Sequence, residues 1–277
     1  MDKNKINKQY SEKIKLVNRY NKYYYNENKP LVSDKEYDEL KNYILSLEKK
    51  YDFLISKDSP SKIIGYKPSK NFKKALHKVP MLSLANAFSK EDLLNFEKKI
   101  LNFISKKKNF KISYSAEPKI DGISASISYK NGILTKGLSR GDGKEGEEIT
   151  ANILTIKDIP KKIINRNFPK EIDIRGEVFI QNSDFINLKE KFSNPRNAAS
   201  GSLRQKNPND TSKIPLKFIA YTFGYQQGLK IENQFEYLKM LKEWGFKINP
   251  FNKLITGVNN LLINYNEIEK KRSEIDF

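Results

Sequence analysis

The sequence contains no cysteine and only one histidine, His77. Without cysteine the chain has no disulfide, no thiol nucleophile and no thiolate ligand, so we expect no zinc in it. A single histidine also excludes a metal site built from several histidines and disfavours Ser-His-Asp catalysis. We therefore expect any chemistry to come from lysine, arginine, aspartate, glutamate or tyrosine side chains.

Long apolar runs are missing as well. No stretch of about 20 apolar residues is present that could cross a bilayer. The first ten residues, MDKNKINKQY, lack the apolar segment of a signal peptide. These features predict a soluble, cytoplasmic protein with no membrane partner.

Acidic residues are few relative to basic ones. The chain has 33 Asp and Glu against 52 Lys and Arg, which gives a net charge of +19. A charge of this sign and size favours a polyanionic partner, and nucleic acid is the first candidate. A composition rich in lysine, asparagine and isoleucine is also typical of an AT-rich genome, so the charge alone does not decide the function.

The first part of the chain has the pattern of a helical hairpin. Apolar residues recur at three- and four-residue steps over residues 6–25, as on an amphipathic helix. Ser33 and Glu36 then match a capping box at the start of a second helix. Residues 57–70 mix Pro, Ser, Gly and Lys without periodicity, which predicts a linker.

The rest of the chain changes character. Strand patterns run through most of residues 110–180, after a helix predicted near 89–104. Asn131-Gly132 between two alternating runs predicts a β-hairpin. Further segments are strands expected at 171–180 and 216–225 and helices expected at 233–244 and 257–272. The predicted fold class is α+β: a small N-terminal helical hairpin domain at residues 1–68, then a domain built on antiparallel sheets at 69–277.

Lys119, in the stretch AEPKIDGISAS, stands between a strand-like run and the predicted hairpin. A lysine held by a rigid frame can act as a nucleophile once its pKa is lowered by burial or by neighbouring cations. Arg140, in SRGDG, is one such cation, and Glu177 lies inside an apolar strand pattern where a carboxylate needs a partner. The plainer interpretation is an exposed turn lysine and a solvated arginine.

Six segments, in this order, resemble the NAD-dependent bacterial DNA ligases over almost the whole chain. The segments are YYYNENKPLVSDKEYDEL, VPMLSL, EPKIDG, SRGDGKEGEEIT, IRGEVFI and NPRNAASGSLRQ. The resemblance implies a cap that binds the nicotinamide mononucleotide half of NAD, followed by a nucleotidyltransferase (ATP-grasp-like ligase) domain. It also implies that Lys119 attacks the α-phosphate of NAD and carries AMP, which then passes to the 5′-phosphate of a DNA nick, with Mg²⁺ neutralising phosphate charge.

The resemblance also assigns roles to residues. It implies catalytic roles for Lys119, Asp121 and Arg204, and contacts with nicked double-stranded DNA for Arg196 and Arg204. Residues implied to contact NAD are Tyr24, Tyr25, Asp34, Tyr37, Asp38, Ser83, Leu84, Glu117, Arg140 and Glu177. The resemblance assigns no residue of this chain as a metal ligand.

Three departures from the family pattern stand out. Tyr25 replaces a usual histidine, and Ala85 replaces a usual aspartate. The chain ends at Phe277, where the family continues into an Asp-Gly-Val-Val-Ile-Lys strand and a later motif lysine. We therefore expect a truncated adenylation region that recognises NAD and does not seal nicks by itself.

Two other interpretations are compatible with the sequence. One is a non-enzymatic, basic remnant of such a ligase that only binds nucleic acid. The other is an ATP-dependent ligase or RNA-capping relative that shares the Lys-x-Asp-Gly lysine, and the acidic and aromatic cap residues disfavour it. We expect the NAD-dependent adenylation region.

Overall fold

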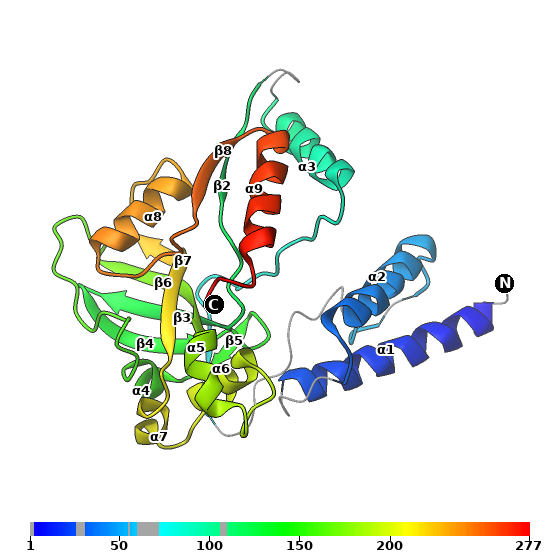
Figure 1. Cartoon of the computed structure of the whole chain (residues 1–277). Helices are drawn as coiled ribbons and strands as arrows, with labels where there is room; N and C mark the ends of the chain where they lie inside the picture. The colour runs from blue at the N-terminus through cyan, green and yellow to red at the C-terminus, as the bar shows by residue number, and fades with distance from the viewer. Residues whose placement is uncertain (1–2, 26–30, 55, 60–71, 106–109) are drawn as a thin grey trace.

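The computed structural model describes residues 3–25, 31–54, 56–59, 72–105 and 110–277, with backbone only at 24, 25, 34 and 35 (Figure 1). The predicted linker at 57–70 and the domain boundary within it lie almost entirely outside these residues, so both stay predictions. No helix in these ranges is long and apolar enough to cross a membrane.

The N-terminal helical hairpin is confirmed. Helix α1 spans Lys3–Tyr25 and helix α2 spans Asp34–Lys50, and the two pack side by side (Figure 1). The apolar stripes predicted from the sequence meet in a small core of their own, which contains Ile6, Tyr10, Ile14, Val17, Ile44 and Leu54.

Ser33 begins the second helix through the predicted capping box. The backbone N–H of Glu36 donates to Ser33 Oγ at 3.3 Å, and the backbone N–H of Ser33 donates to Glu36 Oε2 at 2.8 Å. These bonds satisfy N–H groups that have no partner within the helix.

Residues 72–105 and 110–277 form an α+β domain on antiparallel strands, as expected. The main sheet has four strands in the order β4-β3-β6-β7, and two smaller sheets pair β1 with β5 and β2 with β8. The strands are β1 Lys74–Leu76, β2 Ser113–Ala116, β3 Ile123–Lys130, β4 Ile133–Ser139, β5 Glu145–Glu147, β6 Glu171–Phe179, β7 Lys217–Gln227 and β8 Lys253–Thr256. The helices after the hairpin are α3 Lys90–Phe103, α4 Thr150–Ile153, α5 Asn182–Phe185, η1 Ile186–Leu188 (a 3₁₀ helix), α6 Pro195–Leu203, α7 Pro208–Ser212, α8 Gln234–Glu243 and α9 Val258–Lys271.

The hairpin between β3 and β4 is confirmed at its turn. Asn131 and Gly132 have φ angles of 50° and 75°, the left-handed conformation that a two-residue hairpin turn requires. The strands predicted at 171–180 and 216–225 correspond to β6 and β7, and the three predicted helices correspond to α3, α8 and α9.

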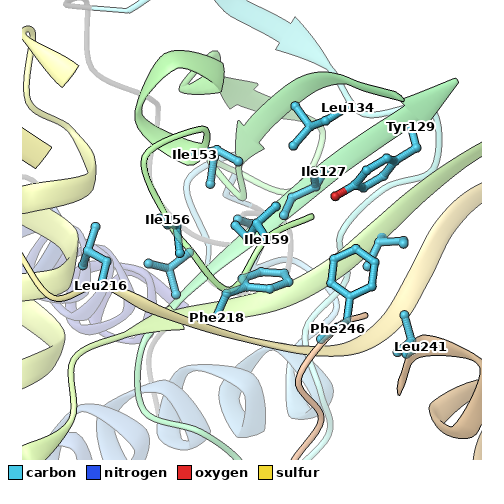
Figure 2. Packing of buried hydrophobic residues seen from close by; sticks show 14 of the residues in the cluster. Ile127, Tyr129, Leu134, Ile153, Ile156, Ile159, Leu216, Phe218, Leu241 and Phe246 are labelled. Atoms are coloured by element: carbon cyan, nitrogen blue, oxygen red, sulfur yellow. The ribbon is translucent and has the colours of Figure 1, made fainter. Parts of the chain in front are cut away.

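Strand β6 has two different faces. Its even-numbered residues Ile172, Ile174 and Val178 lie in the main core. Its odd-numbered residues Glu171, Asp173, Arg175 and Glu177 alternate with them and therefore lie on the opposite, polar face of the sheet. Figure 2 shows core side chains from β3, β7, α8 and the segment 153–159 pointing toward one another beneath the apolar face.

The segment between β5 and β6 differs from the expectation of strands through most of 110–180. Apart from isolated bridges, residues 148–170 form α4 and a series of turns. Buried isoleucines follow one another there at three- and four-residue steps, namely Ile149, Ile153, Ile156, Ile159 and Ile163. That spacing suits a helical turn better than an alternating strand, so the β-branched composition of the segment was a misleading signal.

Two isoleucines on neighbouring strands test how strongly the core holds the sheet. Ile127 on β3 is 0% exposed, whereas Ile133 on β4 is 52% exposed. We expect Ile127→Ala to lower the free energy of unfolding by about 2–5 kcal/mol, because it removes buried methyl groups and leaves a cavity. The matched control Ile133→Ala should cost less than about 1 kcal/mol. Denaturant unfolding of both variants measures the difference, and equal losses would contradict the assignment of these faces.

Candidate active site

Lys119 lies in the loop that joins β2 to β3. The loop is pinned on both sides of the lysine, because Asn249 Nδ2 donates to the carbonyl of Pro118 at 3.1 Å and Ile120 is buried against Phe179 and Ile219. Lys119 itself is exposed. Its amine therefore extends from a backbone that is held in place.

Gly122 brings this loop against strand β6. A Cβ at position 122 would lie 2.3 Å from the carbonyl oxygen of Val178 and 2.9 Å from Cγ of Glu177. Only glycine fits such a close approach of two backbones. The glycine of Lys-Ile-Asp-Gly therefore sets the distance between the loop and Glu177.

Glu177 is the buried acid of the site and is 7% exposed. Burial raises its pKa, while a hydrogen bond from Ser124 and the positive charges of Lys119 and Arg196 oppose that rise. Ser124 Oγ donates to Glu177 Oε2 at 2.9 Å from the neighbouring strand β3. The structure thus brings Lys119 and Glu177 into one electrostatic environment.

Asp121 and Arg196 form an ion pair beside Lys119, with Arg196 Nη1 3.0 Å from Asp121 Oδ1. Arg196 is at the second position of helix α6. Asn194 caps that helix by accepting the N–H of Asn197 at 2.7 Å, and Pro195 fills its first turn. The segment NPRNAASGSLRQ therefore folds locally so that Arg196 reaches the lysine loop.

Arg140 approaches the same site after strand β4. Its Nη2 donates to Ser83 Oγ at 2.8 Å, and its buried Nε has no hydrogen-bond partner among the described residues. Leu84, the neighbour of Ser83, is 78% exposed. An arginine with a buried donor left over is suited to a ligand with acceptor oxygens.

Glu117 is the second partly buried acid. Ser115 Oγ and Gln234 Nε2 donate to its Oε1 at 2.9 Å and 3.0 Å, and Gln234 also donates to the carbonyl of Tyr221 at 2.6 Å. Burial raises the pKa of Glu117 above its ordinary value, and the two hydrogen bonds oppose only part of that rise. Gln234 thus ties Glu117 to strand β7.

Three site residues were missed from the sequence: Ser124, Tyr221 and Gln234. Tyr221 is half-buried near Glu177, Arg175 and Arg140, and burial together with Glu177 raises its pKa to about 12. The alternation on β3 could have indicated Ser124 opposite Glu177, because adjacent strands place facing residues together. No local signal marks Gln234, which reaches the site only through the packing of α8.

Arg204 lies in a different environment from the other predicted site residues. Its Nε is 2.9 Å from Oε2 of Glu147, and that carboxylate is only 1% exposed. Glu147 in turn receives a hydrogen bond from Ser139 Oγ at 3.4 Å. The catalytic and DNA roles predicted for Arg204 stay predictions.

The cap residues are described in part. Tyr37 Oη donates to Asn21 Oδ1 at 2.8 Å, and the ring of Tyr37 packs against the hairpin core. Asp38 is half-buried one residue further along α2. The side chains of Tyr24, Tyr25 and Asp34 lie outside the described residues, so their predicted contacts stay predictions.

A site that could hold a metal by protein groups alone is not found in the described part of the chain. No three acidic or histidine side chains are grouped there as metal ligands. Mg²⁺ usually binds through one or two carboxylates, water and substrate phosphates, and Asp121 and Glu177 are carboxylates of the right kind beside Lys119.

Comparison with known proteins extends the resemblance. Residues 69–277 match the family model of the NAD-dependent DNA ligase adenylation domain, and residues 3–65 match that of the DNA ligase-like, N-terminal NAD⁺-binding domain. Similar curated proteins are the DNA ligases of Pelagibacter ubique (65% identical), Rickettsia massiliae (46%) and Bradyrhizobium sp. strain ORS 278 (44%). The aligned residues cover 97%, 93% and 93% of this chain and 40%, 38% and 37% of those proteins.

The chain belongs to the NAD-dependent DNA ligase family, which confirms the resemblance read from the six segments. It spans about 40% of the length of the curated relatives it matches.

The hydrogen bond from Gln234 to Glu117 generates a prediction about pH. Gln234→Leu removes a donor that stabilises the charged carboxylate, so the pKa of Glu117 should rise further. Carbon-13 NMR titration of the glutamate carboxyls measures this, with the Glu117 resonance assigned by Glu117→Gln. The control is Gln227→Leu, at the exposed end of β7.

The sign of the effect on stability follows from proton binding. Because burial places the folded pKa of Glu117 above its unfolded value, the folded state binds more protons between the two values. The stability contribution of this group therefore falls as pH rises through that window, and Gln234→Leu should extend the window upward. An unchanged or lower pKa for Glu117 would contradict the role assigned to Gln234.

Proposed function

We propose that this chain carries out the adenylation step of an NAD-dependent DNA ligase, in which Lys119 takes AMP from NAD. The observation that carries the proposal is the convergence of Lys119, Glu177 and Arg196 on one side of the main sheet. Membership of the family supports the assignment of the step to this part of the chain.

The step begins with a neutral amine. The Lys119 ammonium releases a proton, and its Nζ attacks the α-phosphorus of NAD. A P–N bond forms as the P–O bond to the nicotinamide mononucleotide phosphate breaks, and that nucleotide leaves with the electron pair. After the attack, the nitrogen of the new P–N bond is positively charged and releases one more proton. The product is a lysyl-AMP phosphoramide.

The cations around the lysine suit this chemistry. Arg140 and Arg196 approach from two different elements, and both can face the phosphate oxygens whose charge grows in the transition state. Glu177 and Glu117 are held by Ser124, Ser115 and Gln234, so their free oxygens can accept hydrogen bonds from the adenosine. We assign these contacts to the AMP half of NAD.

The helical hairpin supplies the other half of the donor site. Asp34, Tyr37 and Asp38 occupy positions i, i+3 and i+4 of α2 and therefore share one face of that helix. The match to the NAD⁺-binding family model supports contact between this face and the nicotinamide mononucleotide half. The tyrosines at 24 and 25 are part of the same proposal.

Mg²⁺ belongs to the proposal as a phosphate-bound ion. When bound, it would neutralise part of the phosphate charge at the reacting centre. Asp121 and Glu177 are the carboxylates that would orient it, and no step depends on a cage made by the protein.

The later partner in the proposal is a DNA nick, whose 5′-phosphate would receive the AMP. The net charge of +19 and the DNA ligase names of the relatives support a nucleic-acid partner. The names of the relatives also support a location in the cytoplasm. We assign Arg204 to DNA, and we assign Arg196 to a DNA phosphate in this later step, after its contact with the phosphate of NAD in the first step. The absence of zinc also stays a prediction.

Covalent labelling tests the nucleophile directly. With NAD labelled in its AMP half, the chain should acquire label that survives denaturation and maps to Lys119 by mass spectrometry. Lys119→Arg should lose the label completely, because a guanidinium does not replace the attacking amine. The matched control Lys130→Arg, at the exposed end of β3, should keep it.

A chain without label would leave the alternative of a nucleic-acid-binding protein. That alternative predicts salt-sensitive DNA binding that Lys119→Ala does not change, and no heat stabilisation by NAD.

The cap contact is tested by a pair of neighbouring residues on α2. We expect Asp38→Ala to weaken NAD binding about tenfold or more, while AMP binding changes little, because AMP lacks the nicotinamide half. Glu39→Ala is the control, since Glu39 is exposed at the next position of the helix. Isothermal titration with both ligands measures the effect, and equal weakening of NAD and AMP would contradict it.

A further inference from the structure

Residues 77–83 form a segment without regular structure that lies against the polar face of the main sheet. We call it the 77–83 segment. Its backbone is bound on one side by the loop after β4, because His77 N–H donates to the carbonyl of Lys144 at 2.9 Å and Met81 N–H donates to that of Gly143 at 2.8 Å. Its last residue, Ser83, accepts the hydrogen bond from Arg140 described above. The segment therefore connects the sheet to a cation of the proposed nucleotide site.

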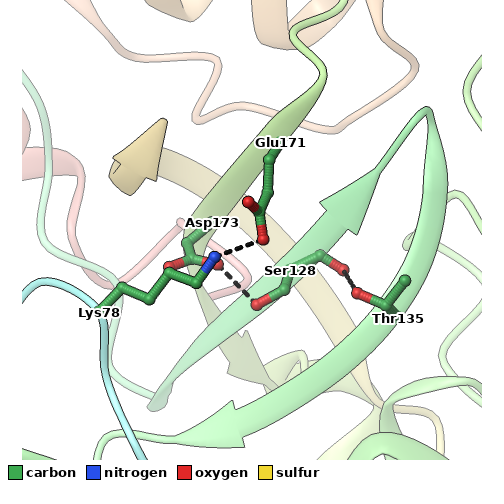
Figure 3. Close-up of polar contacts among 5 residues, drawn as sticks. All are labelled: Lys78, Ser128, Thr135, Glu171 and Asp173. Atoms are coloured by element: carbon green, nitrogen blue, oxygen red, sulfur yellow. Dashed lines mark hydrogen bonds and ion pairs between the residues drawn. The ribbon is translucent and has the colours of Figure 1, made fainter. Parts of the chain in front are cut away.

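Strand β6 also binds this segment, through the side chain of Arg175. Arg175 Nη1 donates to the carbonyl of Pro80 at 3.2 Å, and Arg175 Nη2 donates to the carbonyl of Val79. Lys78 adds a second contact, since it pairs with Glu171 (Figure 3). Its Nζ also lies 4.3 Å from the ring centroid of Tyr225. The two contacts differ in burial, because Arg175 is 8% exposed whereas the side chain of Lys78 is 49% exposed.

The burial of Arg175 is costly unless its hydrogen bonds are made. Desolvation lowers its pKa because burial disfavours the charged form, while the nearby Tyr221 and Asp173 oppose that effect. A planar guanidinium can bind two adjacent carbonyl groups at once. Pro80 makes those carbonyls available, because a proline keeps the residue before it extended and the chain out of a helix.

Gly224 on β7 makes room for this guanidinium. A Cβ at position 224 would lie 2.6 Å from Nη2, 2.8 Å from Nε and 2.9 Å from Cζ of Arg175. Strand β7 is therefore shaped around the guanidinium, independently of the hydrogen bonds to the 77–83 segment.

We propose that Arg175 is a positioning residue for the nucleotide site, acting through the 77–83 segment. It fixes the backbone at Val79 and Pro80, and the fixed segment places Ser83 where its hydroxyl holds the Arg140 guanidinium. This inference rests on the proposed function, since it assigns Arg140 to the phosphate of NAD.

The first experiment measures the segment itself and needs no activity. Hydrogen–deuterium exchange at the amide of Met81 should become at least about tenfold faster in Arg175→Met, because the bond to Gly143 opens more often once the segment is released. Arg166→Met is the matched control, an exposed arginine that should leave this amide unchanged. Unchanged exchange at Met81 in Arg175→Met would overturn the proposal.

The second experiment measures AMP transfer from NAD to Lys119. Arg175→Met should lower kcat/KM about tenfold to a hundredfold, the range expected for lost hydrogen bonds from a charged donor. Arg175→Lys should recover part of this, because an ammonium can still reach a carbonyl. In an Arg140→Ala background, Arg175→Met should change kcat/KM less than about twofold, because its effect passes through Arg140. If Arg175→Met lowers kcat/KM by the same factor with and without Arg140, the two residues act independently. That result would indicate a general structural role for Arg175 and overturn the proposal.

Gly224→Ala provides a second route if Arg175→Met does not fold. The new methyl group displaces the guanidinium while the charge remains, so we expect faster exchange at Met81 and lower kcat/KM, as in Arg175→Met. Unchanged values in a folded Gly224→Ala protein would count against the proposal. A parent chain that takes no AMP from NAD would refute the proposed function, and the exchange of Met81 would still decide whether Arg175 holds the segment.

Discussion

The two-faced strand β6 is the constraint on which the rest of this structure depends. Alternation in EIDIRGEVF places Ile172, Ile174 and Val178 in the main core and places four charged side chains on the other face. A shift of one residue in the pairing with β3 would exchange the two faces, so the hydrophobic core also fixes where the charges stand. The candidate active site is therefore held by the same packing that holds the fold.

Charges on an inner strand must each find a partner, and here each partner comes from another element. Asp173 accepts from Ser128 Oγ at 2.6 Å (Figure 3), Glu177 accepts from Ser124, and Arg175 donates to the carbonyls of the 77–83 segment. Serines at alternate positions of β3 are small enough to leave space for these longer side chains. Because a buried charge without a partner is expensive, the polar face couples the sheet to the segments that cover it.

The sequence predicted those features that depend on neighbouring residues. The capping box of Ser33 and the Asn131-Gly132 turn are local, and both are confirmed. Pairing between β2 and β8 joins residues such as Tyr114 and Ile255, which are far apart in the chain, so no local pattern indicates it. The same holds for Gln234 at Glu117 and for Gly224 at Arg175. The β-branched composition of residues 148–170 wrongly predicted strands. These residues lie in α4 and in turns, and their isoleucine side chains fill the main core.

The two arginines that the family resemblance assigns to DNA differ in how easily their partners can be exchanged. Arg196 is 22% exposed and pairs with Asp121, whose side chain is 75% exposed, so water can solvate the carboxylate when it leaves the pair. A phosphate could therefore replace Asp121 at low cost. Arg204 pairs with Glu147, whose carboxylate is buried, and removing the arginine from that pair would leave a buried charge uncompensated. An incoming phosphate group should thus displace Asp121 from Arg196 more readily than it displaces Glu147 from Arg204.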